Sequence, residues 1–183
     1  MTVRLGELTW LPARDNPELM AVPSAAALQS WPDEAARSRV HVAEIDPELA
    51  DTAALTAAYD LPLDVSANCV LVAGRRAGEE RIAAAVVLAT TRADVNSTVK
   101  RLLDVRKASF LPTDRAVAES SMEYGGITPI GLPAGWRVLV DSRVARTDHV
   151  IVGSGLRRSK LALPGALLAS LPGVEVVDGL GTD

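Results

Sequence analysis

Runs of apolar residues separated by turn-forming residues outline the strands expected in this chain. The apolar runs at 68–73 and 81–90 enclose the charged turn Gly74-Arg75-Arg76-Ala77-Gly78-Glu79-Glu80, a pattern that predicts a β-hairpin. Short strands are also expected at 41–45, 136–140, 150–152, 161–163 and 174–177. Neighbouring strands joined by short turns pair antiparallel, because a parallel pair needs a crossover of a dozen or more residues.

Apolar residues at helical spacing alternate with these strands. Asp46-Pro47 offers an N-cap and a first-turn proline, and Asp94 or Asn96 is placed to cap a later helix. The expected helices are 46–60, 94–103, 164–171, and one that begins at 112–114, runs through Met122 and stops at Gly125-Gly126. The fold class we expect is α/β (α+β): a mixed, largely antiparallel sheet or partly closed barrel, flanked by helices.

The length of 183 residues favours a single domain with an extension at one end. Residues 1–35 are rich in Pro and Ala, and their prolines interrupt any long helix. We expect this segment to form short helical pieces packed on a domain that spans 36–183.

Composition narrows the functions that are open to this chain. Hydrophobic residues make up 48% and charged residues 23%, as in an ordinary globular protein. A formal net charge of -4 opposes nonspecific attachment to phosphate backbones, so any contact with RNA must be local. The 3% of aromatic residues supply no ladder for stacking single-stranded bases.

Cysteine and histidine usage indicates neither a metal site nor a catalytic triad. Cys69 is the single cysteine and lies in an apolar strand, where a buried thiol is expected. His41 and His149 have no cluster of metal-ligand residues around them and no recognisable serine or cysteine nucleophile. No export signal or membrane span can be read, so we expect a cytoplasmic protein.

The most distinctive motif is a loop in which five of nine residues are glycine or proline, Gly125-Gly126-Ile127-Thr128-Pro129-Ile130-Gly131-Leu132-Pro133. Such a loop is stiff, and its glycines let the main chain approach a ligand closely. It would present main-chain N–H and C=O groups at a pocket wall. The same composition also suits an ordinary connection between a helix and a strand.

A second glycine loop, Gly153-Ser154-Gly155, is followed by Arg157 and Arg158. It would suit the cradling of a phosphate or nucleotide, although it lacks the spacing of a Walker loop. A hairpin turn with solvated arginines explains the pattern equally well. Asp141, which follows an apolar run, is expected to cap the next turn.

In their order, these pieces resemble the YbaK/EbsC family of aminoacyl-tRNA deacylases, which is similar to the editing domain of prolyl-tRNA synthetases. The resemblance runs from about Val40 to Gly179. It rests on the strands around Cys69 and Val86, on Asp94-Val95-Asn96, on Lys107-Ala108-Ser109-Phe110, on the loop 125–132, and on Val140-Asp141-Ser142 followed by Val152-Gly153-Ser154-Gly155.

The resemblance implies a pocket for the aminoacylated 3′ end of tRNA, in which mischarged amino acid is removed by ester hydrolysis. The turn from Gly125 to Pro129 matches the family's GxxxP loop. The resemblance assigns a catalytic role to Asn68, Gly125 and Thr128. It assigns substrate binding to Gly126, Ile127, Pro129, Gly131, Ser154 and Gly155. It implies no cofactor, metal or membrane, and it allows an aminoacyl-tRNA synthetase as a partner.

One position departs from the family pattern. Editors of this family typically carry a lysine early in the strand that here begins with Asn68, and an amide supplies no positive charge. Lys100, Lys107 and Lys160 are not expected to point into the same site. Two alternatives therefore stay open: a noncatalytic module that binds an aminoacyl-tRNA 3′ end or a related small molecule, and a protein that shares only the fold.

Overall fold

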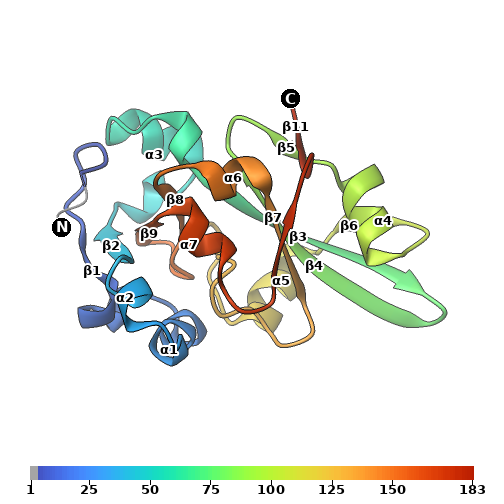
Figure 1. Cartoon of the computed structure of the whole chain (residues 1–183). Helices are drawn as coiled ribbons and strands as arrows, with labels where there is room; N and C mark the ends of the chain where they lie inside the picture. Colours follow the sequence, from blue (N-terminus) through green and yellow to red (C-terminus); the bar gives the residue numbers. More distant parts are fainter. Residues whose placement is uncertain (1–3) are drawn as a thin grey trace.

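Two main β-sheets and the helices around them form the fold, in the computed structural model that describes residues 4–183 (Figure 1). One sheet has the strand order β1-β2-β9-β8, and the other has the order β10-β7-β4-β3-β6. A small sheet pairs β11 with β5. The strands are β1 (Leu11–Pro12), β2 (His41–Glu44), β3 (Ala67–Arg76), β4 (Glu79–Leu88), β5 (Arg92–Ala93), β6 (Ala108–Phe110), β7 (Arg137–Asp141), β8 (Val150–Gly153), β9 (Ser159–Leu163), β10 (Val174–Val177) and β11 (Gly181–Thr182).

The helices are short and lie between the strands. The α-helices are α1 (Val22–Ser30), α2 (Glu34–Arg37), α3 (Thr52–Ala58), α4 (Lys100–Leu103), α5 (Thr113–Ser120), α6 (Ser142–Arg146) and α7 (Gly165–Ala169). Four 3-10 turns lie at Ala13–Asp15, Pro17–Leu19, Pro47–Leu49 and Leu63–Val65, and a π-helical turn, Val95–Val99, leads into α4.

Strand pairing confirms the expected mixed sheet. Every pair in the four-stranded sheet is antiparallel. In the five-stranded sheet β7 runs parallel to both of its neighbours, β4 and β10, whereas β3 pairs antiparallel with β4 and β6. Within residues 4–183 the sheets do not close into a barrel, so the expected fold class is confirmed in its mixed-sheet form.

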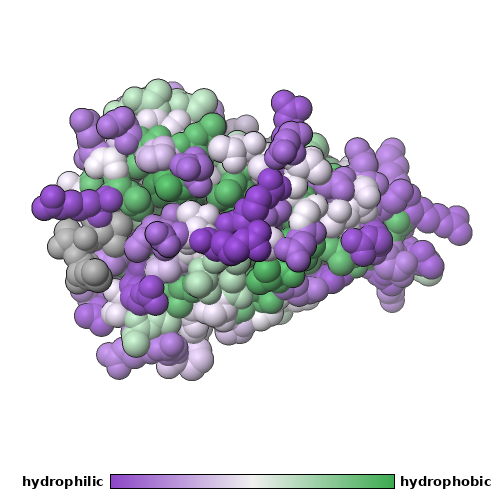
Figure 2. All heavy atoms as spheres, turned by 45° about the horizontal axis from the view of Figure 1, so that its top comes forward, coloured by the Kyte–Doolittle hydropathy of each residue, from purple (hydrophilic) through white to green (hydrophobic). Residues whose placement is uncertain are grey.

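The predicted hairpin is present, but its turn is narrower than the sequence suggested. Strands β3 and β4 continue to Arg76 and Glu79, and only Ala77 and Gly78 form the turn. Both of these residues have positive φ, as a two-residue turn between twisted strands requires. The exposed charges of residues 75–80 gather at this end of the molecule, on the right in Figure 2.

Three local features differ from the expectation drawn from periodicity. The helix expected at 46–60 is divided, because Asp46 caps the 3-10 turn and the extended residue Asp51 precedes α3. The residues after Asp141 form the helix α6 rather than a simple turn, with Asp141 as its N-cap. The short strands β1, β5, β6 and β11 were not predicted. The expected cap at Asp94 is confirmed, since its carboxylate accepts from the Ser97 and Thr98 N–H groups.

The core uses small residues where a strand is covered on both faces. Along β4, Ala83 and Ala85 pack into one apolar cluster and Ala84 into another, and all three are fully buried. Successive residues of a strand point to opposite faces, which explains this division. The N-terminal segment joins a third cluster through Leu28 and Trp31.

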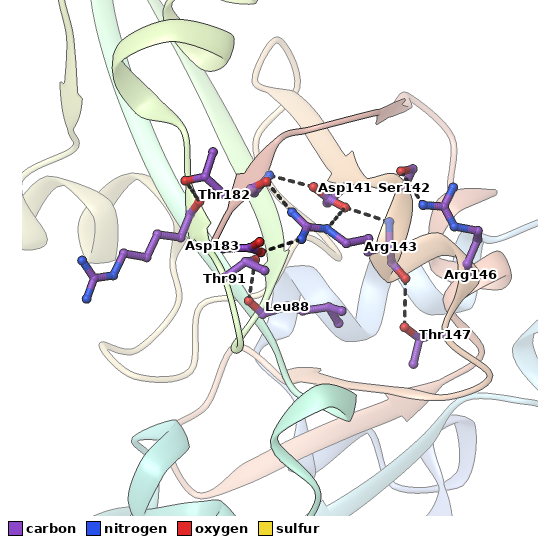
Figure 3. A network of polar contacts seen from close by, with 11 residues as sticks. Leu88, Thr91, Asp141, Ser142, Arg143, Arg146, Thr147, Thr182 and Asp183 are labelled. Atoms are coloured by element: carbon purple, nitrogen blue, oxygen red, sulfur yellow. Dashed lines mark hydrogen bonds and ion pairs between the residues drawn. The ribbon is translucent and has the colours of Figure 1, made fainter.

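A buried aspartate ties the C-terminal residues to the end of β7 (Figure 3). Asp141 is 1% exposed, and its carboxylate accepts hydrogen bonds from the main-chain N–H of Arg143 at 2.7 Å and of Gly181 at 2.7 Å. The Arg143 guanidinium pairs with the same carboxylate at 3.2 Å. Burial raises the pKa of Asp141, but these hydrogen bonds outweigh burial and hold the pKa below its usual value.

We expect Asp141→Ala to lower the free energy of unfolding by about 3 kcal/mol at pH 7, because it removes a helix cap and leaves a buried N–H group unpaired. The measurement is urea unfolding. The control Glu175→Ala removes a half-exposed partner of Arg137 and should cost less than about 1 kcal/mol.

The pH dependence of this effect has a definite sign. A carboxyl group whose pKa is lower in the folded protein stabilises the fold at pH values above 3.8, which is its pKa in the unfolded chain. That stabilisation is lost as the pH falls through the pKa of the folded state. The gap between wild type and Asp141→Ala should therefore shrink below about pH 4. A gap that is equal at pH 7 and pH 3 would contradict this role of the carboxylate.

Candidate functional site

A cavity of about 220 Å³ lies where β3 and α3 begin, beside β8 and β9. Residues from five separated segments line it, and the glycine-proline loop supplies one wall through Gly125 and Ile127. The other lining residues are Ala50, Asp51, Thr52, Leu55, Ser66, Ala67, Asn68, Cys69, Tyr124, Ile151, Val152, Gly153 and Lys160.

The start of β3 supplies the polar side of the cavity. Ser66 and Asn68 are two residues apart in extended chain, so their side chains lie on the same face. Thr52, in the first turn of α3, donates from its hydroxyl to Asn68 Oδ1 at 2.9 Å. This bond fixes which way the Asn68 amide faces, because the oxygen is directed to the threonine.

The glycine-proline loop is held by direct main-chain contact with the second glycine loop. Gly155 donates from its N–H to the Gly126 carbonyl at 2.7 Å, and Glu123 donates to the Gly155 carbonyl at 2.8 Å. A Cβ atom on Gly153 would lie 2.2 Å from the Gly126 oxygen. A side chain at Gly153 is therefore excluded, and the two loops that stood out in the sequence form one unit.

Lys160 corrects an expectation from the sequence, since it does point into this cavity. Its Nζ donates to the Gly125 carbonyl at 3.2 Å and to the Ala50 carbonyl at 2.9 Å. The residue is only 8% exposed. The cavity that contains Asn68 therefore also contains a lysine, but the lysine comes from β9 instead of β3.

The environment of Lys160 makes it easier to deprotonate. Burial is the main cause and lowers the pKa of its ammonium to about 8, from the usual lysine value of 10.5. The negative charge of Asp51 acts in the opposite direction, and the positive charge of Arg157 reinforces the effect of burial. Near neutral pH the group is mainly charged, and it loses its proton within the weakly alkaline range.

Tyr124 and Arg157 stand together beside the loop. Tyr124 lines the cavity and is 61% exposed, and the Arg157 guanidinium lies over its ring, 5.9 Å from the centroid. The Arg157 main-chain N–H also donates to Glu123 Oε2 at 2.6 Å. An exposed aromatic ring that lines the cavity thus has a cation beside it.

A family model described as an aminoacyl-tRNA editing domain matches residues 46–171, which is more than half of the chain and includes every residue that lines the cavity. The chain belongs to the aminoacyl-tRNA editing domain family. A search of curated proteins gave no match.

Solved structures agree with this editing domain in fold. A structure described as a "putative trans-editing enzyme for prolyl tRNA synthetase" shares 17% identity with a TM-score of 0.70, and the match covers 88% of this chain and 98% of that one. A hypothetical protein shares 18% identity with a TM-score of 0.71, over 85% of this chain and 99% of that one. A scaffold from epitope backbone grafting shares 17% identity with a TM-score of 0.73, over 89% and 97%.

Three of the site residues predicted from sequence line the cavity of this editing domain, namely Asn68, Gly125 and Ile127. The others lie outside its lining. Gly126 and Gly155 join the two loops, and Pro129 and Gly131 border a second cavity of about 360 Å³ beside Trp31 and Trp136.

Thr128 and Ser154 are both completely buried. The Ser154 hydroxyl lies 2.7 Å from that of Ser159, and it accepts from the Leu156 N–H at 3.1 Å, so it shapes the second loop. The Thr128 hydroxyl has no hydrogen-bond partner among the described residues. The placement of these two residues differs from the prediction that they line the pocket.

Sequence reasoning missed Thr52, Ser66 and Lys160. The available signal was a lysine within the apolar run of β9. A lysine is almost never fully buried unless its charge is paired, so Lys160 in such a run indicates a buried ammonium group with partners. Thr52 and Ser66 carried no comparable signal, since hydroxyl residues are common at helix starts and strand ends.

Among residues 4–183, no cluster of three or more His, Cys, Asp or Glu side chains is arranged to hold a metal ion. In the same part of the chain, no helix has the length and hydrophobicity needed to cross a bilayer.

Cys69 lines the cavity, but burial raises the pKa of its thiol to about 12. The thiolate, which is the reactive form, is therefore scarce near neutral pH. We expect iodoacetamide at pH 8 to alkylate native protein at least about tenfold more slowly than protein unfolded in urea. Mass spectrometry of timed samples measures both rates, and equal rates would contradict the protected thiol.

Proposed function

We propose that this protein hydrolyses the ester bond of mischarged aminoacyl-tRNA in the cavity between Gly125 and Asn68. The observation that carries the proposal is the ammonium group of Lys160, which the Gly125 and Ala50 carbonyls hold inside that cavity. Family membership supports aminoacyl-tRNA editing as the general activity. The lysine supports the chemical step.

The ammonium group retains a donor for a ligand. A lysine ammonium has three N–H donors, and two of them are directed to the carbonyls of Ala50 and Gly125. A third donor is left for the carbonyl oxygen of a bound ester. A positive charge in a partly desolvated site stabilises the developing oxyanion more strongly than it would in water.

The main chain of the loop offers further donors. Gly125 and Ile127 line the cavity, and within residues 4–183 their N–H groups donate to no other residue. Gly125 has a φ of +80°, a conformation that residues with side chains rarely adopt, and a Cβ atom there would lie 2.5 Å from the Arg157 guanidinium. These donors suit the same oxygen, since an oxyanion is stabilised best by donors that are already in position.

The reaction requires no nucleophilic side chain. Water adds to the ester carbonyl, the bond to the ribose oxygen breaks, and the free amino acid and the tRNA hydroxyl are released. A proton from the attacking water passes to the ribose oxygen through solvent. The role assigned to Lys160 is to stabilise negative charge on the carbonyl oxygen, and the high pKa of the Cys69 thiol disfavours a covalent route through that residue.

The entrance of the cavity suits the end of a nucleic acid. The exposed ring of Tyr124 can stack on the terminal base, and the Arg157 guanidinium can pair with a phosphate. These contacts are local, which is compatible with a chain whose net charge is -4. The protein would act in the cytoplasm, where tRNA is charged, and a synthetase that makes the error would be its natural partner.

We expect Lys160→Met to lower kcat/KM for release of a mischarged amino acid by about 100-fold or more, the range seen when one oxyanion donor is removed. The assay follows loss of labelled amino acid from a panel of mischarged tRNAs. Lys107→Met removes an exposed lysine elsewhere and should leave the rate unchanged. Thermal unfolding checks that both variants fold.

A charge returned to the cavity should restore part of the rate. Asn68→Lys in the Lys160→Met background places a lysine in the same cavity from β3 and is expected to recover at least about tenfold. Full activity of Lys160→Met would overturn the role of Lys160. A wild-type protein that binds aminoacyl-tRNA but accelerates no hydrolysis would instead support the noncatalytic binding module.

The pH profile distinguishes a cation from a base. Because the pKa of Lys160 is lowered to about 8, its ammonium loses its proton as the pH rises through that value. We expect kcat/KM, corrected for spontaneous ester hydrolysis at each pH, to fall between pH 7 and 9. A corrected rate that rises over this range would indicate that the neutral amine acts as a general base.

A further inference from the structure

The carboxylate of Asp51 has no role in the chemistry described so far. Asp51 lines the cavity, and its side chain is exposed there. It is the N-cap residue of α3, but its carboxylate accepts no hydrogen bond from the helix. Within residues 4–183 this carboxylate also forms no ion pair. A negative charge at the cavity is therefore open to a ligand.

The residues on either side of Asp51 tie it to two polar groups of the cavity. The carbonyl of Ala50 accepts from Lys160 Nζ at 2.9 Å, and the hydroxyl of Thr52 donates to Asn68 Oδ1 at 2.9 Å. Asp51 itself is extended, with φ of −69° and ψ of 138°. Its Cα lies one residue, about 3.8 Å, from that of each anchored neighbour. The backbone at Asp51 is therefore held in place from both sides.

Asp51 and Lys160 bring opposite charges to the cavity without forming an ion pair. Among the described residues that line the cavity, Asp51 is the only acidic one and Lys160 the only basic one. The ammonium group is directed to the carbonyls of Ala50 and Gly125. Although burial lowers the pKa of Lys160, the charge of Asp51 acts in the opposite direction, so the two groups are close enough to interact. Each keeps capacity for a separate partner.

An aminoacyl ester carries a positive charge next to its reacting carbonyl. Its α-nitrogen lies about 2.5 Å from the carbonyl carbon, because a single carbon atom separates them. If the carbonyl oxygen faces Lys160, a second cation enters the same cavity, and the two cations repel each other. A carboxylate beside Lys160 offsets this repulsion, and it accepts hydrogen bonds from the α-ammonium group.

We propose that the Asp51 carboxylate binds the α-ammonium group of the aminoacyl ester, so that the site selects esters with a free α-amino group over esters whose nitrogen is acylated or replaced by oxygen. The inference rests on the proposed function, because it assumes that the ester carbonyl is bound at Lys160. Asp51 is then a specificity-determining residue. Peptidyl-tRNA and formylaminoacyl-tRNA, in which the nitrogen is acylated and uncharged, are excluded as good substrates.

The test compares esters that differ only at the α position. One tRNA transcript is charged with each amino acid of the panel and, separately, with the matching α-hydroxy acid, in which a neutral hydroxyl group replaces the ammonium. Alanyl and lactyl esters form one such pair. Each kcat/KM is divided by the rate constant for spontaneous hydrolysis of the same ester, because the ammonium group itself makes an ester more labile.

The comparison is made at pH 6, where the Lys160 ammonium and the α-amino group are both mainly protonated. We expect wild-type protein to prefer the aminoacyl ester by at least about fivefold, the factor that a partly exposed charge pair contributes. Asp51→Asn removes the charge and keeps the shape, and asparagine is as good an N-cap as aspartate. In this variant the preference should fall by about fivefold or more, mainly through a higher KM for the aminoacyl ester.

Asp64→Asn is the matched control. Asp64 lies in the 3-10 turn Leu63–Val65 shortly before β3, is exposed, and is outside the cavity lining. The substitution changes the net charge by the same amount, so it reports any general effect of charge on tRNA binding. It should leave the preference for the aminoacyl ester unchanged. Thermal unfolding should show that both variants fold.

The outcomes separate this inference from the proposed function. If wild-type protein accelerates hydrolysis of no aminoacyl ester in the panel, the proposed function fails. If it hydrolyses aminoacyl esters without preferring them, or if Asp51→Asn keeps the preference, hydrolysis stands and the α-ammonium site is overturned. An equal loss of preference in both variants would also overturn it, because a general charge effect would explain both. Loss in Asp51→Asn alone supports the site.

Discussion

A single buried ammonium group is the constraint on which the site depends. Lys160 is placed by the antiparallel pairing of β9 with β2 and β8, and its charge is held by the carbonyls of Ala50 and Gly125. These carbonyls belong to segments on either side of the cavity, so one side chain joins the glycine-proline loop to the start of α3. A charge in this position is expensive to bury, and the lowered pKa reflects that cost.

The position of Gly125 in turn depends on how closely two main-chain segments approach. Gly126 and Gly153 are in contact through atoms that leave no space for a Cβ, and the hydrogen bond from Gly155 to Gly126 fixes their relative position. Glycine is therefore required at these two positions for close packing, since neither has a positive φ. The rigid loop lets the fold hold a carbonyl against the ammonium group.

The cavity divides into a charged end and a neutral polar end. Lys160, Asp51 and Arg157 interact electrostatically at the first end, while Ser66 and Asn68 share one face of the chain at the second. At the charged end a cation and a carboxylate can serve the reacting carbonyl and the α-ammonium group of one aminoacyl ester. Family membership supports aminoacyl-tRNA editing as the general activity, and the structural neighbours share the fold.

Local patterns in the sequence were sufficient for the hairpin, for the caps at Asp94 and Asp141, and for the two glycine loops, because turn and cap chemistry acts over a few residues. They also placed Asn68, Gly125 and Ile127 near one another through the family resemblance. Only the tertiary structure decided that Lys160 enters the cavity and that Thr128 and Ser154 do not line it. The register between β8 and β9 determines the side to which Lys160 points. The groups that it meets there come from distant segments, because Gly125 is 35 residues and Ala50 is 110 residues away along the chain.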